Sequence, residues 1–344
     1  MTAVSVLAVG GWSVRVHRRA ALVGGALVVA LAGAVLASLS LGAHPVAVSD
    51  VLAVLVGRGS AVDELLVGTL RLPRVLTAAL VGATLGLAGA LFQSVTRNPL
   101  GSPDVIGFDA GASTGALVAM LVLHGGVLAT SVGAVVGGAL TAAIIFGLSS
   151  RGGVAPLRLV LVGIGGGAIL LAVNSTLIVR AQLYDAQSAS VWLVGNLAGR
   201  GWPEVAMLAP LVAVGLVAAA VLGPALTLGE FADDRSASLG LHPGRVRLGT
   251  IVLGVLLASG AVAVAGPIQF IALAAPQVAR RLTGATGPNA VVAGLTGAVL
   301  LVITDLAARE AFQPRQLPVG VLTGLVGGAY LAWLLGREWR RGRA

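Results

Sequence analysis

Long runs of apolar residues, separated by short polar or charged breaks, extend along almost the whole 344-residue chain. A helix needs about 20 consecutive apolar residues to cross a bilayer, so each run predicts one membrane segment. The pattern predicts an all-α integral membrane protein with ten segments, at 20–41, 70–94, 105–123, 127–148, 155–179, 203–228, 248–265, 267–282, 290–308 and 317–335.

Two of these segments have alternative interpretations. Segment 20–41 follows a basic cluster, as a signal peptide would. It is longer than the apolar region of a signal peptide, and no small-residue cleavage site precedes His44 and Pro45, so we expect a retained helix. Segment 267–282 is short and contains Pro276, which interrupts helical hydrogen bonding. We expect a half-helix there that does not cross the membrane fully.

The composition excludes several classes of function. The chain is 57% apolar and only 10% charged, with 50 glycines and a mean hydropathy of +0.99, whereas soluble domains are about 25% charged. All 22 basic residues are arginine, which excludes Schiff-base lysines and the lysine of a nucleotide-binding P-loop. The absence of cysteine excludes disulfides and thiolate metal sites.

The arginines also indicate an orientation. With the amino terminus in the cytoplasm, 15 of the 22 arginines fall on the cytoplasmic side, and the net charge of +9 lies there too. A basic protein this apolar is expected to hold its arginines at membrane faces, not on nucleic acid. The layout predicts cytoplasmic tails at 1–19 and 337–344 around a single membrane domain at 20–336, with a long cytoplasmic loop at 229–247.

Small residues predict how the segments pack. Glycines four residues apart place bare backbone on one face of a helix and allow close helix approach; they are Gly82/Gly86, Gly107/Gly111/Gly115, Gly133/Gly137, Gly163/Gly167 and Gly320/Gly324/Gly328. Residues 86–93 weakly resemble 263–270, which is either an internal repeat of the kind found in transporters or a coincidence.

Catalytic constellations are nearly absent from the sequence. The four histidines are isolated, and no pair of carboxylates or histidines has ligand spacing. The glycines at 163–167 resemble a phosphate loop but lie inside an apolar run, where helix packing explains them better. We therefore predict no catalytic residue and no metal site.

Four stretches depart from plain spans and loops. Arg71-Leu-Pro-Arg74 carries two arginines on the side that has few, either to anchor lipid phosphates or to dock an acidic partner. Residues 96–111 form a connection longer than a simple turn needs. Residues 228–247 predict one or two short helices, lying flat on the membrane or on a partner. Residues 266–281 contain two prolines and two glutamines, as in a broken helix buried within protein.

These stretches, together with Leu317-Pro-Val-Gly320, resemble the FecCD-like permeases of iron-chelate and cobalamin ABC importers. Within that family, 98–107 and 274–281 look most like the permease subunit of ferric-enterobactin-type siderophore importers. Gln269 and Gln277 stand where the family more usually has glycine and histidine. The resemblance implies a structural role for eight motif residues. They are Asn98, Pro99, Gly101, Pro103, Gly107, Gly266, Pro267 and Pro276.

The resemblance implies the ten-helix architecture of vitamin B12 and iron-siderophore importer permeases, in a bacterial cytoplasmic membrane. It implies alternating access with a second permease subunit, more a homologue than an identical copy. Two cytoplasmic ATPase subunits would carry the ATP and Mg²⁺, and an extracytoplasmic binding protein would deliver the ferric siderophore. This chain would bind no cofactor or metal ion itself, because the iron travels in its chelator, and no nucleic acid.

The resemblance also implies roles for particular residues. Arg71, Arg74 and Arg309 match positions that receive acidic residues of the binding protein, although Asp305 could hold Arg309 in a local pair. Asn174 and Thr323 match the translocation path. The coupling loop that contacts the ATPase is matched by Glu230, Asp234, Arg235, Ser238, Leu239, Gly240 and Arg245.

Two other functions remain open on the sequence alone. Asp109 and Asp305 lie within or near predicted spans, as in a proton- or sodium-coupled secondary transporter of a small solute. A membrane scaffold that transports nothing is the second alternative, and copurification of an ATPase subunit would argue against it.

Overall fold

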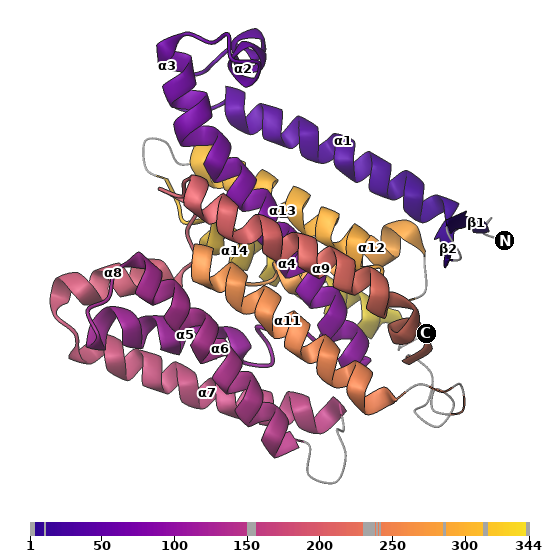
Figure 1. The fold of residues 1–344 in the computed structure, drawn as a ribbon. Coiled ribbons are helices and arrows are strands. Elements are labelled where there is room, and N and C mark those ends of the chain that lie inside the picture. The colour runs from indigo at the N-terminus through magenta and orange to yellow at the C-terminus, as the bar shows by residue number, and fades with distance from the viewer. Residues whose placement is uncertain are drawn as a thin grey trace.

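The structure is a computed structural model that describes residues 4–9, 12–149, 156–229, 238, 240, 242–284, 287–311 and 316–341. Most of its long helices lie along one common direction and form a bundle (Figure 1). The elements are β1 (Val4–Val9), β2 (Trp12–His17), α1 (Arg18–Ser40), α2 (Val48–Leu55), α3 (Ala61–Asp63), the π-helix η1 (Glu64–Arg71), α4 (Leu72–Thr96), α5 (Phe108–Leu117), the π-helix η2 (Val118–Val122), α6 (Val127–Ser149), α7 (Pro156–Arg180), α8 (Leu183–Leu193), α9 (Trp202–Gly229), α11 (Pro243–Ala265), α12 (Ile271–Thr283), α13 (Ala290–Glu310) and α14 (Val319–Arg341).

Each of the ten predicted membrane segments coincides with a helix. Seven helices in the described ranges are long and apolar enough to cross a membrane, and Phe108–Val122 and Val319–Trp333 are shorter apolar helices. The tenth segment is α12, which has 13 residues and is therefore about 20 Å long, less than the roughly 30 Å of a hydrocarbon core. The predicted all-α membrane fold is confirmed.

Two short helices and one β-hairpin were not predicted by the hydropathy pattern. The short helices α2 and α8 have 8 and 11 residues, too few to span a bilayer. Strands β1 and β2 pair antiparallel, with Val4 opposite His17 and Val9 opposite Trp12. All three lie outside the apolar runs on which the prediction rested.

Helix α4 lies in the middle of the bundle and packs against α9, α11, α12 and α13 (Figure 1). It continues η1 and α3, so residues 61–96 form one unbroken 36-residue helix. A Cβ atom at Gly82 would overlap the carbonyl oxygen of Gly297, and one at Gly86 would overlap that of Ala293. The close helix contact predicted from the glycine spacing is confirmed at this pair.

Other glycines of the same spacing behave differently from one another. Gly115 touches the backbone of Gly133 and Gly137, as predicted. A Cβ atom at Gly324 or Gly328 would meet nothing within 4 Å. Within the described part of the chain, the predicted close packing is therefore not formed at these two positions.

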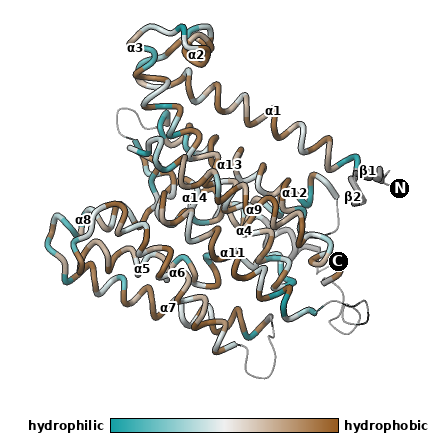
Figure 2. Tube along the Cα trace, in the orientation of Figure 1, coloured by the Kyte–Doolittle hydropathy of each residue, from teal (hydrophilic) through white to brown (hydrophobic). Residues whose placement is uncertain are grey.

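The helices consist mainly of apolar residues, and several loops and helix ends are more polar (Figure 2). Val29, Leu128 and Val179 are 73%, 79% and 83% exposed. Large apolar side chains left open on several long helices require a hydrocarbon environment. The chain is a multi-pass membrane protein.

Candidate functional site

Two groups of polar side chains lie at opposite ends of α4. We call the end of the bundle near α2 and α3 the α2 end, and the opposite end, where α4 finishes, the Thr96 end. The arginine cluster at the α2 end consists of Ser38, Arg71, Arg74, Asp305, Arg309 and Gln316. The amide cluster at the Thr96 end consists of Gln93, Asp104, Gln277 and Arg280.

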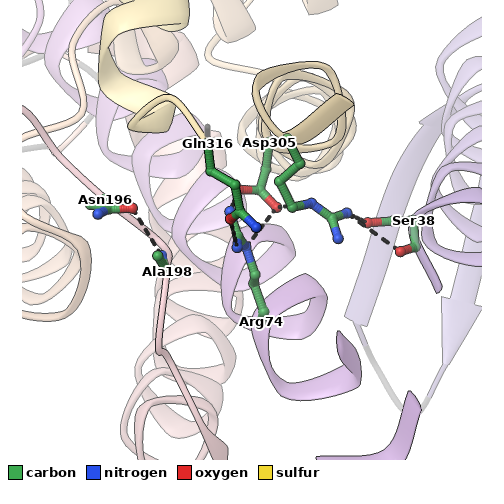
Figure 3. A network of polar contacts seen from close by, with 7 residues as sticks. Ser38, Arg74, Asn196, Ala198, Asp305 and Gln316 are labelled. Atoms are coloured by element: carbon green, nitrogen blue, oxygen red, sulfur yellow. Dashed lines mark hydrogen bonds and ion pairs between the residues drawn. The ribbon is translucent and has the colours of Figure 1, made fainter. Parts of the chain in front are cut away.

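Arg74 donates three hydrogen bonds within the arginine cluster. Its Nη2 atom lies 2.9 Å from Asp305 Oδ1, and its Nε donates to Asp305 Oδ2 at 3.2 Å. Its Nη1 donates to Gln316 Oε1 at 2.9 Å (Figure 3). The fork of the guanidinium fits the carboxylate in two parallel bonds, so Arg74 joins α4 to α13 and to the segment before α14.

Asp305 is shared between two arginines. Arg309, one helical turn later, places Nε 3.3 Å from Asp305 Oδ2 and donates from Nη2 to Ser38 Oγ and to the Ser38 carbonyl. Asp305 is 1% exposed and Arg309 is 8% exposed. A charge this deeply buried is stable only when it is paired, so the three ions form one unit that connects α1, α4 and α13.

Arg71 satisfies the end of α1. Its Nη1 donates to the Leu39 carbonyl at 2.7 Å, and its Nη2 donates to the His44 carbonyl. The last carbonyls of a helix have no partner within the helix, and a cation there also complements the helix dipole. Gly42 allows this approach, since a Cβ atom at that position would lie 3.1 Å from Arg71 Nη2.

The structure thus brings Arg71, Arg74 and Arg309 together on one face, and it also forms the local Asp305–Arg309 pair that was the alternative. Much of their hydrogen-bonding capacity is used within the chain. Docking of a partner protein by these arginines stays a prediction. The sequence alternative based on intramembrane carboxylates loses support at Asp305, because two guanidinium groups neutralise it.

The amide cluster connects α12 to α4 and to the loop at 97–107. Gln93 Nε2 donates to the Leu273 carbonyl at 3.0 Å, and its Oε1 accepts from Arg280 Nη2. Gln277 Nε2 donates to the Pro99 carbonyl at 2.8 Å. Backbone groups that a broken helix leaves open inside a membrane must find such partners.

The first residues of α12 have an acidic partner in this loop. Asp104 Oδ2 accepts from the Phe270 amide at 3.4 Å, where the helix begins without a side-chain cap of its own. A carboxylate is favoured at the amino end of a helix by the helix dipole. Asp109, in the first turn of α5, is 7% exposed, and its Oδ1 has no hydrogen-bond partner among the described residues.

The predicted motif residues form hydrogen bonds and close contacts that involve the backbone. Asn98 Oδ1 accepts from the Leu100 amide at 2.9 Å, and the Pro103 carbonyl accepts from the Phe108 amide at 3.1 Å. Gly107 has φ +85°, and a Cβ atom there would lie 2.8 Å from the Gly163 carbonyl. A Cβ atom at Gly101 would overlap Thr96, and one at Gly266 would overlap the carbonyl oxygen of Trp192. Pro276 is buried inside α12, and Pro267 packs against Gly195.

The two predicted path residues point into their own chain. Asn174 is 3% exposed, and its Oδ1 accepts from Thr114 Oγ1 at 2.7 Å. Thr323 is also 3% exposed and donates to the Gly320 carbonyl at 3.1 Å. Their role in a translocation path stays a prediction.

Most of the predicted coupling loop is outside the described residues. Glu230, Asp234, Arg235 and Leu239 belong to that part, whereas Ser238, Gly240 with φ +82° and the exposed Arg245 in the first turn of α11 are described. Among the residues that the structure describes, no three histidine, aspartate or glutamate side chains are grouped to hold a metal ion.

Sequence reasoning missed Ser38, Gln93 and Gln316 as members of the two clusters. Gln93 stands near the end of a long apolar run, which is a signal that it has a buried partner. Ser38 and Gln316 gave no signal, because their partners lie far away in the sequence.

A multi-pass apolar bundle with a short helix enclosed by other helices has the architecture of a membrane transport protein. The family model of the FecCD transport family matches residues 19–337, so the chain belongs to this family.

Known proteins of similar sequence are permease proteins. The chain is 44% identical over 300 residues to the ferric enterobactin transport system permease protein FepG of Escherichia coli (strain K12), covering 87% of this chain and 91% of that protein. It is 37% identical over 280 residues to the Fe(3+)-citrate import system permease protein YfmE of Bacillus subtilis (strain 168), covering 81% and 84% of the two chains.

A solved structure has the same fold. It is an inward-facing conformation of a metal-chelate type ABC transporter, with a TM-score of 0.81 and 24% sequence identity, covering 92% of this chain and 99% of that chain.

Proposed function

We propose that the chain is the transmembrane permease subunit of an ATP-driven importer of ferric siderophores, working by alternating access. The observation that carries this proposal is the 44% identity to a ferric enterobactin permease protein over 87% of the chain. The fold agrees, since α12 and the loop at 97–107 supply irregular backbone inside a bundle, where transporters place their moving or ligand-facing parts.

The proposed partners follow from what the chain lacks. Without lysine it has no conventional nucleotide phosphate site, so ATP and Mg²⁺ belong to two separate ATPase subunits, contacted through the loop at 229–247. A second permease subunit, homologous and not identical, completes the path around Asn174 and Thr323. No cofactor is assigned to this chain.

The proposed orientation places the α2 end outside the cytoplasm of a bacterial cell, with both termini in the cytoplasm. An extracytoplasmic binding protein then meets the face that holds Arg71, Arg74 and Arg309. The Arg74 bond to Gln316 is exposed, so a carboxylate of the partner can replace this neutral amide as the acceptor. Charge complementarity of this kind raises the association rate more than the affinity.

The experiment is uptake of radiolabelled ferric enterobactin by cells in which this chain replaces their own permease subunit. An ATP-driven importer stops when ATP is depleted with arsenate and continues when an uncoupler collapses the proton gradient at maintained ATP. Uptake that survives arsenate and stops with the uncoupler would identify a secondary transporter instead. Copurification of an ATPase subunit with the tagged chain is the accompanying measurement.

A further inference from the structure

A cavity at the α2 end of the bundle, separate from the arginine cluster, has no role in the proposed transport function. Its volume is 480 Å³, within the range of sites for small molecules. It lies between η2, the turn that leads into α6, helix α8 and Arg200, which is two residues before α9. Its polar wall includes His124, Asp185, Ser188 and Arg200.

Arg200 is short of acceptors although its side chain is only 19% exposed. Within the described residues it has one ion pair, with Glu204 at 3.7 Å, and its Nε is buried without a hydrogen-bond partner. Glu204 is already bonded to the Gly201 amide at 2.9 Å. A guanidinium offers five N–H donors. Within the described residues the Arg200 side chain forms no hydrogen bond, so the donors on Nη1 and Nη2 are available to an anion in the cavity that Arg200 lines.

Helix α8 supplies negative charge to the lining of the cavity. Asp185 and Ser188 are three residues apart on α8, which places them on the same face of that helix. Within the described part of the chain, Asp185, Ser188 and His124 have no hydrogen bond or ion pair from their side chains. A carboxylate and a guanidinium that line one cavity without pairing fit a ligand that carries both charges.

Several side chains around the cavity are apolar, as expected beside a lipid. Trp192 and Met120 add apolar wall, and the neighbouring Leu123, Val127 and Leu128 are 70%, 70% and 79% exposed. The cavity is lined by residues at the end of η2 and the start of α6. The ends of apolar helices lie at the depth of lipid headgroups, where tryptophan is also typical.

We propose that this cavity binds the headgroup of a zwitterionic phospholipid with a primary ammonium, as in phosphatidylethanolamine. The phosphate accepts hydrogen bonds from Arg200, and the ammonium donates to Asp185 and Ser188. The acyl chains extend along the exposed apolar side chains of the α5–α6 turn. A trimethylated ammonium has no N–H donor, so phosphatidylcholine fits this wall less well.

The test is lipid retention by the purified chain, together with its copurifying subunits, measured by native mass spectrometry after delipidation and titration with phosphatidylethanolamine, phosphatidylcholine or phosphatidylglycerol. The wild type should retain phosphatidylethanolamine most strongly. Arg200→Gln should weaken that retention about tenfold or more, because a charge-assisted contact is lost. Arg58→Gln is the matched control, since Arg58 is exposed and does not line the cavity.

Asp185→Asn gives an independent readout that does not depend on the folding of the Arg200 variant. It should keep phosphate binding but lose the preference for ethanolamine over choline. Competition by soluble phosphoethanolamine distinguishes the sources: a lipid site resists it, whereas a site for a free zwitterion is emptied by it. Equal retention of all three lipids by the wild type, or unchanged retention in both variants, would overturn the proposal without affecting the transport function.

Discussion

The two ends of α4 stabilise the same helix by different chemistry. At the α2 end, the partly buried Arg74 binds the buried carboxylate of Asp305, which the buried Arg309 shares. At the Thr96 end, Gln93 and its neighbours bind mainly through neutral amides and backbone carbonyls.

The difference teaches how each end responds to change. A buried ion group is stable as a whole and fails when one charge is removed, because the remaining charges are left unpaired. Neutral hydrogen bonds contribute about 0.5–1.5 kcal/mol each and can be lost singly. We therefore expect the α2 end to behave as a fixed anchor and the Thr96 end to tolerate local adjustment.

The largest effect is expected from Asp305→Asn. It removes the carboxylate that Arg74 and the buried Arg309 share, and it should lower the free energy of unfolding by about 3–5 kcal/mol. Thermal unfolding of the purified protein, followed by size-exclusion chromatography, measures this loss. The control is Asp50→Asn, at an exposed carboxylate. Equal melting temperatures for the two variants would show that the ion group contributes no stability.

A smaller loss is expected from Gly89→Ala, which belongs to the Thr96 end. The new methyl group would overlap the Ala272 carbonyl and force α12 away from α4, at a cost of about 1–3 kcal/mol. Gly165→Ala is the matched control, because a Cβ atom at that position meets nothing within 4 Å. The comparison fails if Gly165→Ala destabilises the protein as much as Gly89→Ala does.

Gln277→Met should cost about 1 kcal/mol, since it removes one neutral hydrogen bond from a buried carbonyl. The expected signature is local: hydrogen–deuterium exchange should rise in the loop at 97–107 and stay unchanged in α1 and α13. Increased exchange at the α2 end as well would mean that the two ends are coupled and not independent.

The smallest effect is expected from Gln316→Ala. Its bond to Arg74 is exposed, and the Asp305 bonds remain, so stability should change by about 0.5 kcal/mol or less. The same thermal assay measures this variant beside Asp305→Asn. A loss as large as that of Asp305→Asn would place Gln316 inside the ion group instead of at its rim.

The sequence predicted the elements that depend on local composition. Long apolar runs identified ten helical segments, and Pro276 together with the short run predicted that α12 is short. The Asp305–Arg309 pair was also foreseeable, since the two residues are one helical turn apart. No local signal could show that Arg74 reaches Asp305 across 231 positions, or that Gln93 reaches Leu273 across 180. Those contacts depend on how the helices pack.

The bare contact between α4 and α13 limits how the protein can move. At Gly82 and Gly86 the two backbones touch without any side chain between them, so shifting one helix along the other by a single residue would push a side chain into a carbonyl group. Helices α4 and α13 therefore cannot slide along each other and have to tilt or translate together as one rigid body, which we call the α4–α13 pair. Any opening and closing of a pathway must come from hinges outside the α4–α13 pair. Glycines that face open space, such as Gly324 and Gly328 on α14, leave room for such a displacement.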